Sequence, residues 1–549
     1  MHEDQRRPSI IDRRRRFYVF LGTVSAAYLA ISVAYALRLP MIMDEFQGAH
    51  VVHRLSDEIP YRDFIPYKTV LGYYLQSFFL SLGTGLWEKM VSVKIGMALV
   101  TALSLAAVSL ALRRWLSERA ILLSLAMLAF HSTFLERSAE LRVDMLTGLA
   151  GLLGLTALLG GNPFLAGLLT GTSFLISQKG AYFVIAGGVA AFFVIRDPAK
   201  RRLASHWITF WLGSGIVLAL YLATFATVSD LDTVFRATFI APSRVAFEDL
   251  YQIRLQFWLQ TLRRNPAFYA WSAAALGLLA LSAGHWRNRL LFAYSSVLTI
   301  LAILHRQPWP YFFVLWLPTL FVMNAAGLDL LRDRLSPRRY RLACALLIVT
   351  AVALPLTRLP LVLQRDSTAQ RRTIEIANRI MSHEDRYLAG MEMIWTRTQH
   401  PPELAWLDAP ALAALASAPA AEVGQLVEKL RVSPPRLLIL NYRLLNLPES
   451  VRQHLVSSYS HRGDCVYVYA PPFEPGGIEL GIDGSYRLES RGAMRIGPAW
   501  VRPGDQVDLA AGTHYTDAVD PFRLHLIPEE EPEPTGRPCE DLFPYVYYF

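Results

Sequence analysis

Long runs of apolar residues recur through the first two thirds of this chain. One lies near the start, at 17–39, and another covers 90–112. A helix that crosses a lipid bilayer needs roughly 20 mainly apolar residues, and about eleven segments reach or approach that length. The sequence therefore predicts a polytopic α-helical membrane protein. The predicted spans are 17–39, 90–112, 120–134, 143–160, 163–177, 181–195, 207–228, 266–283, 289–304, 309–329 and 340–359.

The composition agrees with this architecture. Of the 549 residues, 53% are hydrophobic and only 18% are charged, which disfavours a single soluble domain. Segment 17–39 has no small-residue cleavage site after a short apolar core, so we predict a retained span and not a removed signal peptide.

The net charge of +9 indicates topology and not nucleic-acid binding, because the basic residues lie in short loops between apolar runs. The tract Arg13–Arg16 places the N-terminus in the cytoplasm by the positive-inside rule. An odd number of spans then leaves the chain after about residue 360 outside, which in the inner membrane of a bacterium means the periplasm. Four later basic loops fall on the cytoplasmic side in this topology: 113–119, 196–202, 285–289 and 332–341.

The long apolar runs stop near residue 360, so we predict a membrane domain over 1–360 and a periplasmic tail. Helical and strand-like segments alternate over 361–475, which predicts an α/β domain. Short alternating segments punctuated by Gly and Pro follow over 476–549, which predicts a small antiparallel β-module and tail, with 529–538 as a solvated linker.

The three cysteines fall in two different environments. Cys344 lies within a predicted span, whereas Cys465 and Cys539 lie in the external tail. A disulfide between these two would persist in an oxidising space, and two free thiols are equally consistent with the sequence.

Polar and ionisable residues gather in the turns on the predicted outer face. Ionisable groups are costly at membrane depth, so their positions are informative. We expect the turns to converge on a pocket at the outer membrane face. The residues are Asp44, Glu45, Lys68 and Tyr73 in the first loop and its amphipathic segment 69–83, then Glu136, Arg137, Glu140, Arg142 and Asp144, then Gln178 and Lys179, and finally His305, Arg306 and Gln307.

Each group also has a purely structural interpretation. Asp44 and Glu45 suit a helix N-terminus, whose dipole favours acids. Arg142 and Asp144 suit a local salt bridge, and Lys179 suits an interface where Lys extends its ammonium toward water. The segment 69–83 suits either a short span or an interfacial helix.

Five stretches, taken in order, resemble the GT-C superfamily of polytopic glycosyltransferases, particularly the branch of bacterial aminoarabinose transferase and the protein O-mannosyltransferases. Their order carries more information than any one of them, and they cover about the first 330 residues. In such enzymes a sugar on a polyprenyl phosphate is moved to an acceptor, usually with inversion. The stretches are DEFQGAHVVHRLSDEIPYRDF, KTVLGYY, LRVDM, SQKGAYF and HRQPWPYFFVLWLP.

The resemblance implies roles for individual residues. Asp44 takes the place of the general base, Lys68 that of the lysine on the lipid phosphate, and Asp144 that of the acid in the second external turn. One departure is that Lys68-Thr69-Val70 stands where the family has Lys-Pro. We predict Glu45 or Asp144 to orient the sugar or acceptor or to hold a cation. Candidate phosphate helpers are Arg142, Lys179 and Arg306, and candidate pocket residues are Gln178, His305, Gln307 and Tyr73.

The predicted partners are a polyprenyl-phosphate sugar, membrane lipids, and an acceptor in the cell envelope that is a lipid, a polysaccharide or a protein. No cofactor is predicted, and neither is a metal, since no ligand motif is evident, although a divalent cation remains possible. No Gly-rich phosphate loop is present.

Two other interpretations stay open. A transporter or flippase would also bury ionisable groups, usually near the bilayer midplane and often between repeated halves. A non-catalytic scaffold would use the membrane part as an anchor and the β-module to bind glycans or partners.

Overall fold

The computed structural model describes residues 10–66, 68–193, 203–241, 254–528 and 538–543. The chain divides into two compact units, which we treat separately. The helical unit comprises Met1–Leu39, Arg54–Gly83 and Lys89–Arg365, and the second unit comprises Pro40–His53, Thr84–Glu88 and Asp366–Phe549. Residues 40–53, which the sequence analysis includes in the membrane domain, thus group with the C-terminal part.

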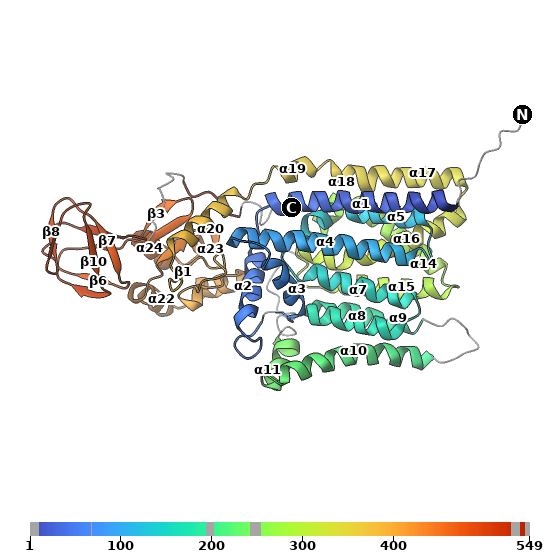
Figure 1. The fold of residues 1–549 in the computed structure, drawn as a ribbon, viewed down its shortest axis with the longest axis horizontal. Coiled ribbons are helices and arrows are strands. Elements are labelled where there is room, and N and C mark those ends of the chain that lie inside the picture. The colour runs from blue at the N-terminus through green and yellow to red at the C-terminus, as the bar shows by residue number, and fades with distance from the viewer. Residues whose placement is uncertain (1–9, 67, 194–202, 242–253, 529–537, 544–549) are drawn as a thin grey trace, which may run out of the picture. The chain divides into compact units, whose positions relative to one another are not determined.

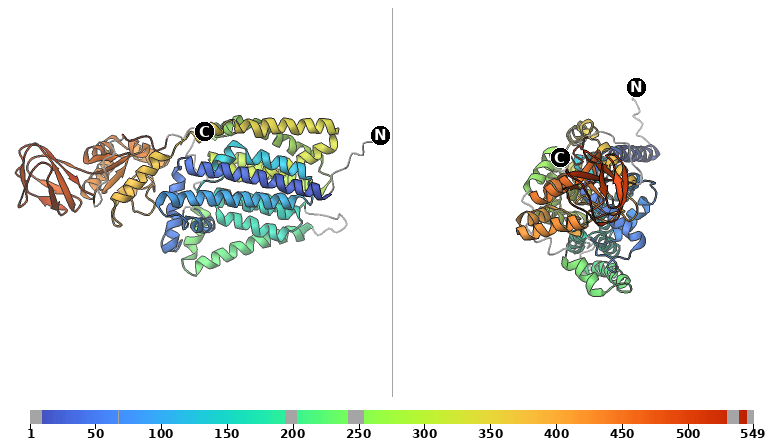
Figure 2. Two further views of the ribbon diagram at one scale, coloured as in Figure 1. Left: turned by 45° about the horizontal axis from the view of Figure 1, so that its top comes forward. Right: turned by 90° about the vertical axis from the view of Figure 1, so that its left-hand side faces the viewer.

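The helical unit consists of helices that run side by side along one direction, as the two views in Figure 2 show. Within the described residues, six helical segments are long and apolar enough to cross a membrane. They are α1 (Ile10–Arg38), α4 (Leu86–Leu112), α10 (Leu203–Ala226), α15 (Trp286–Leu304), the segment of η3 (Pro310–Phe312) with α16 (Phe313–Arg334), and the segment of α17 (Pro337–Leu347), η4 (Ile348–Ala353), α18 (Leu354–Leu356) and α19 (Leu359–Leu363).

The remaining predicted spans fall on shorter helices, so the total of about eleven stays a prediction. These helices are α5 (Glu118–Ala129), α7 (Asp144–Leu159), α8 (Pro163–Ile176), α9 (Ala181–Ala191) and α14 (Pro266–Leu281). The unit also contains α3 (Leu71–Leu80), α6 (Ser132–Arg137), η1 (Gln178–Gly180), α11 (Leu231–Phe235), η2 (Arg236–Ile240) and α13 (Arg254–Arg264).

Helix α16 forms the core of the helical unit. Every residue from Phe313 to Leu328 is buried, and the helix packs against α5, α7 and α14. A helix that is apolar on all sides is expected at such a buried position. Its first residues directly follow the turn that contains His305, so the core helix fixes where that turn lies.

The predicted cytoplasmic loop 113–119 lies against α1 and α16 at one end of the helical unit. Arg113, which follows α4, lies over the ring of Phe17 in α1, at 4.5 Å from its centroid. Ser117 caps α5, and its backbone N–H donates a hydrogen bond to Asp329 Oδ2 at 2.7 Å. Figure 1 shows the ends of α4 and α16 and the starts of α5 and α17 at this end of the helical unit. Loop 196–202 lies outside the described residues.

The C-terminal segment of the second unit starts with an α/β part. Its sheet has the order β1-β2-β4-β3, with β1 parallel to β2 and the other pairs antiparallel. Its elements are α20 (Thr368–Ile380), β1 (Tyr387–Leu388), η5 (Pro402–Leu404), α21 (Ala409–Ser417), α22 (Ala420–Val432), β2 (Leu437–Ile439), α23 (Tyr442–Leu445), α24 (Glu449–Ser458), β3 (Tyr459–Gly463) and β4 (Val466–Tyr469). Most of α2 (Met43–Asp57) also belongs to this unit.

The predicted β-module follows, and all its strand pairs are antiparallel. One sheet has the order β10-β7-β12-β5, and two further pairs are β11-β6 and β8-β9. The strands are β5 (Pro472–Phe473), β6 (Ile478–Leu480), β7 (Gly484–Glu489), β8 (Met494–Ile496), β9 (Ala499–Val501), β10 (Gln506–Leu509), β11 (Gly512–His514) and β12 (Phe522–Leu526). The predicted linker 529–538 lies almost wholly outside the described residues.

A disulfide joins Cys465, directly before β4, to Cys539, and their Cα atoms are 4.4 Å apart. The sequence left open whether these thiols pair, and the structure pairs them. Cys344, in α17, is free. The bond closes a loop of 74 residues that contains the whole β-module, so it ties the end of the chain to the central sheet of the second unit.

We predict that replacing Cys465 and Cys539 together by Ala lowers the free energy of unfolding of the second unit by about 2–4 kcal/mol, because the unfolded chain loses a constraint. Thermal unfolding of the detergent-solubilised protein measures the effect. Cys344→Ala is the control and changes stability by less than about 0.5 kcal/mol. Alkylation of both external thiols in the unreduced wild-type protein would contradict the pairing.

Candidate functional site

Three cationic side chains surround the carboxylate of Asp144, the first residue of α7. Lys179 Nζ lies 2.7 Å from Oδ1, while Arg142 Nη2 and Lys68 Nζ lie 3.0 Å and 3.3 Å from Oδ2. The Asp144 side chain is only 1% exposed. Lys68 precedes α3, Arg142 lies between α6 and α7, and Lys179 belongs to η1, so three separate turns meet at this carboxylate. We call these four residues the Asp144 cluster.

The Asp144 cluster carries three positive charges and one negative charge. Its cations are largely buried, with exposed side-chain fractions of 12% for Lys68, 6% for Arg142 and 22% for Lys179. Cations attract an anion more strongly where water is excluded. A second anion beside the cluster would therefore be stabilised, most effectively one with several acceptor oxygens such as a phosphate.

Aromatic side chains from η3 line the cluster. The guanidinium carbon of Arg142 lies 3.3 Å from the ring centroid of Tyr311, and Lys179 Nζ lies 5.3 Å from the same centroid. Cations are attracted to the face of an aromatic ring. His305 stacks on Phe312 with the ring centroids 4.1 Å apart. The turn after α15 therefore joins the cluster through Tyr311 and Phe312.

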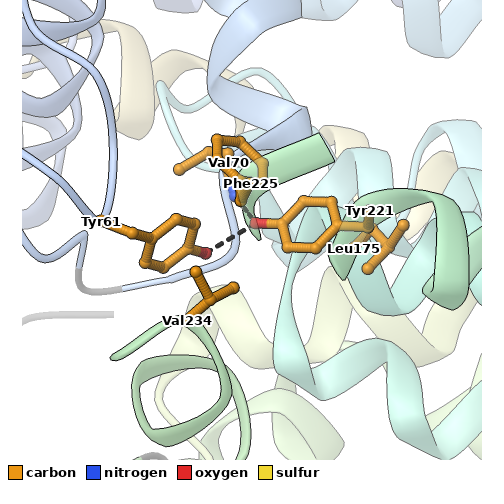
Figure 3. Packing of buried hydrophobic residues seen from close by; sticks show 6 residues of the cluster. All are labelled: Tyr61, Val70, Leu175, Tyr221, Phe225 and Val234. Atoms are coloured by element: carbon orange, nitrogen blue, oxygen red, sulfur yellow. Dashed lines mark hydrogen bonds between the residues drawn. The ribbon is translucent and has the colours of Figure 1, made fainter. Parts of the chain in front are cut away.

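A tyrosine pair anchors the loop that carries Lys68 (Figure 3). The hydroxyls of Tyr61 and Tyr221 are 2.6 Å apart, and the backbone N–H of Val70 donates to the Tyr221 oxygen at 3.4 Å. Both tyrosines are buried, so these bonds satisfy polar groups that water does not reach. The loop is thus fixed two residues beyond Lys68. The surrounding apolar cluster is Tyr61, Val70, Leu175, Tyr221, Phe225 and Val234.

Helix α3 starts in close contact with the turn that carries Asp144. A Cβ placed on Gly72 would lie 2.7 Å from Val143 Cγ1 and 2.9 Å from Ile176 Cγ2, so only glycine allows this approach. The hydroxyl of Thr69 donates to the Phe174 carbonyl at 3.0 Å. These contacts hold the segment after Lys68 against α8 and the start of α7.

The other predicted pocket residues lie around the turns of the cluster. Gln178 adjoins Lys179 and is half-buried, and its Nε2 has no acceptor within the part of the chain that the structure describes. His305 Nδ1 lies 2.8 Å from the hydroxyl of Tyr182. Arg306 and Gln307 follow in the same turn and are half-buried, whereas Tyr73 is buried in α3.

Asp44 and Glu45 belong to the second unit. Asp44 is half-buried in the first turn of α2. Glu45 is 1% exposed, and its Oε2 accepts a hydrogen bond from the backbone N–H of Ile42 at 2.9 Å. This contact matches the interpretation in which an acid stabilises the helix N-terminus.

The acids of the second external turn separate into different ion pairs. Glu136 contacts Arg264 of α13 at 3.2 Å and Arg365 at 3.6 Å. Glu140 contacts Arg137 at 2.6 Å. Only Arg142 and Asp144 of this turn form part of the Asp144 cluster. Sequence reasoning missed Arg264 and Arg365, because neither lies in a turn that we singled out.

Sequence reasoning also missed Tyr311, Tyr61 and Tyr221. Tyr311 belongs to the aromatic run PWPYFF, and its position six residues after His305 was the available signal. Nothing in the sequence pairs Tyr61 with Tyr221. Among the described residues, no three His, Cys, Asp or Glu side chains come together as a metal site would require.

Comparison with known proteins finds similarity in structure alone: no family model and no curated protein sequence matches the chain. ArnT from Cupriavidus metallidurans, solved with undecaprenyl phosphate, matches with a TM-score of 0.52 at 14% identity, over 77% of this chain and 92% of that one. The chain has the GT-C fold. This result confirms the resemblance predicted from the sequence at the level of the fold.

Two archaeal structures agree. The oligosaccharyltransferase of Archaeoglobus fulgidus in the apo form matches with a TM-score of 0.51 at 12% identity, over 90% of this chain and 75% of that one. AglB from Archaeoglobus fulgidus, in complex with an inhibitory peptide and a dolichol-phosphate, matches with a TM-score of 0.52 at 11% identity, over 89% and 74%.

We predict that Asp144→Asn destabilises the helical unit by about 3–5 kcal/mol, because three buried cations lose their counter-charge. Thermal unfolding in detergent measures the change. Asp232→Asn is the matched control, since Asp232 forms a solvent-exposed pair with Arg236, and its effect stays below about 1 kcal/mol. Equal stability of the two variants would show that the Asp144 cluster does not need its carboxylate.

Proposed function

We propose that the chain is an integral-membrane glycosyltransferase that moves a sugar from a polyprenyl-phosphate donor to an acceptor in the cell envelope. The Asp144 cluster carries this proposal, because it concentrates three cations at the end of a helix in a GT-C fold. Structures of the same fold hold undecaprenyl phosphate or a dolichol-phosphate. In this chain, Lys68, Arg142 and Lys179 would bind the corresponding phosphate, with Arg306 as a further candidate.

The Asp144 cluster suits the charge change of the reaction. As the acceptor oxygen attacks the anomeric carbon, the bond from that carbon to the phosphate oxygen breaks, and its electron pair leaves with the phosphate. Fixed cations beside the leaving oxygens stabilise this charge without reorganisation. Asp144 itself is a weak proton acceptor, because three cations stabilise its ionised form. We therefore assign Asp144 to positioning the cations.

The general base in this proposal is Asp44. An acceptor hydroxyl must lose its proton as it attacks, and a carboxylate within hydrogen-bond reach typically contributes about 10²- to 10⁴-fold to the rate. Glu45 is the weaker candidate, since its side chain is 1% exposed whereas Asp44 is half-buried. Attack on the face opposite to the phosphate inverts the anomeric configuration, as is usual for the resembling enzymes.

The distribution of charge supports a site on the outer side of the membrane. Asp144 begins α7, and at the other end of this helix the Leu159 carbonyl accepts from Arg287 Nε at 3.3 Å, in one of the basic loops. The 16 residues of α7 span about 24 Å. The positive-inside rule puts the basic end in the cytoplasm and hence the Asp144 cluster outside. The Cys465–Cys539 disulfide supports a periplasmic second unit.

The isoprenoid chain of the donor would lie along α3. This helix buries one face and exposes an apolar one, and it begins three residues after Lys68. The exposed apolar side chains are Leu71, Tyr74, Leu75 and Phe78. The segment 309–316 fits such a groove less well, because Phe312 through Trp316 are buried in packing.

A transporter or flippase is the weaker interpretation. Such proteins usually hold their substrate near the bilayer midplane. The Asp144 cluster lies at the end of α7 and not half-way along it.

We predict that Lys68→Ala, Arg142→Ala and Lys179→Ala each weaken binding of undecaprenyl phosphate at least about tenfold, since a charge-assisted contact contributes about 1.5–3 kcal/mol. Titration of the purified protein in nanodiscs with this lipid measures the affinity. Arg332→Ala removes an exposed cation among the basic loops and serves as the control. Wild-type affinity in all three variants would exclude the cluster as the phosphate site.

We predict that Asp44→Asn lowers sugar transfer about 10²- to 10⁴-fold while undecaprenyl phosphate still binds, because only the proton acceptor is lost. Mass spectrometry of envelope glycolipids and polysaccharides compares a deletion strain complemented with the wild type or the variant. Asp57→Asn changes an exposed acid at the end of the same helix and is the control. Unchanged transfer by the Asp44 variant would remove it as the base.

A further inference from the structure

Two aromatic side chains of the β-module lie open to solvent. Trp500 of β9 is 64% exposed, and Tyr515 is 67% exposed. In the antiparallel pair of β8 and β9, Trp500 lies directly opposite Arg495.

Residues 515–517 extend the hairpin on the other edge of β8. Ile496 forms a bridge with Thr516, and the Gly497 N–H donates to the Tyr515 carbonyl at 2.9 Å. The Arg495 N–H donates to Asp517 Oδ1 at 2.6 Å. The segment 515–517 thus lies beside β8, antiparallel to it, and is joined to it by this isolated bridge.

Alternation along these strands decides which side chains share a face. Successive side chains of a strand point to opposite faces. The inner face holds buried side chains, and the outer face holds exposed ones. The inner set is Met494, Ile496, Val501 and Thr516, and the outer set is Arg495, Trp500, Tyr515 and Asp517.

The outer face is open between its aromatic residues. Adjacent strands are about 4.8 Å apart, so β9 and the segment 515–517 on either side of β8 are about 10 Å apart. Gly497 lies opposite Tyr515 and has no side chain, and a Cβ added there would meet nothing within 4 Å. Its φ of 55° also favours glycine. A molecule longer than one sugar ring would be needed to reach both Trp500 and Tyr515.

The chemistry of this face fits a neutral carbohydrate. The face of an aromatic ring packs against the apolar C–H side of a sugar ring. Arg495 offers several N–H donors and Asp517 offers carboxylate acceptors, which suits neighbouring hydroxyl groups. Their charges balance, which disfavours a nucleic acid or an anionic membrane surface, since both require an excess of cations. Two aromatic rings separated by polar residues also differ from the continuous apolar patch of a stable protein interface.

We propose that the outer face of β8, β9 and residues 515–517 is a glycan-binding surface for a neutral oligosaccharide, with Trp500 and Tyr515 each stacking on a sugar ring. Arg495 and Asp517 bond hydroxyls between the two rings. This surface is distinct from the Asp144 cluster, and binding of a glycan here does not depend on the proposed sugar transfer. It would take an envelope polysaccharide as ligand.

The test uses the full chain in nanodiscs and a panel of neutral oligosaccharides of one to six sugars, built from mannose, glucose, galactose or arabinose. We expect the affinity for at least one series to rise between one sugar and several. Trp500→Ala and Tyr515→Ala each weaken that binding about tenfold, and Trp500→Tyr restores most of it. Val456→Ala changes an apolar side chain of α24 that is 61% exposed and leaves binding unchanged.

Two results would overturn the proposal. One is that no oligosaccharide binds the wild type more tightly than the double variant W500A/Y515A. The other is that Trp500→Ala instead abolishes binding to anionic vesicles or converts a dimer to a monomer, which would assign the face to lipid or to a second copy. The variant Lys68→Ala distinguishes this proposal from the proposed sugar transfer. We expect it to lose binding of the donor phosphate and to retain glycan binding at this surface.

Discussion

The buried carboxylate of Asp144 is the constraint on which the helical unit depends at its proposed outer end. Lys68, Arg142 and Lys179 come from three turns that are far apart in the sequence, and their charges would separate these turns if no anion lay between them. The carboxylate fixes their spacing to within hydrogen-bonding distance.

Neutral contacts make that arrangement rigid. The Tyr61–Tyr221 bond and the close approach of Gly72 to Val143 hold the Lys68 loop against α7, α8 and α10. Tyr311 contacts Arg142 from the start of the buried core helix α16. The cations are thus attached to buried parts of the unit. Preorganisation of this type is what stabilises developing charge on a leaving group, since no reorganisation is needed during the reaction.

The sequence was most informative for ionisable residues, because the cost of placing charge at membrane depth restricts their positions. Ionisable residues at membrane depth must meet one another, so Lys68, Arg142, Asp144 and Lys179 were predictable as a group. The aromatic contacts were not, because a run such as PWPYFF suits packing and cation binding equally. Glu45 was expected in the site, but its bond to the Ile42 N–H depends on where α2 begins. The pairing of Cys465 with Cys539 was left open, since their separation alone does not show whether two thiols meet.

The two proposed sites recognise different chemical groups. The Asp144 cluster recognises charge, which a lipid-linked donor carries in its phosphate and a neutral glycan lacks. The outer face of β8 and β9 recognises ring faces and hydroxyls, which a glycan offers repeatedly along its length. A weak site that binds a repeating polymer keeps it close to the rest of the same chain by raising its effective concentration. Such a surface does not need to contact the reacting sugar, and with Trp500 and Tyr515 each stacking on one ring it would favour a polysaccharide over a single free sugar as its ligand.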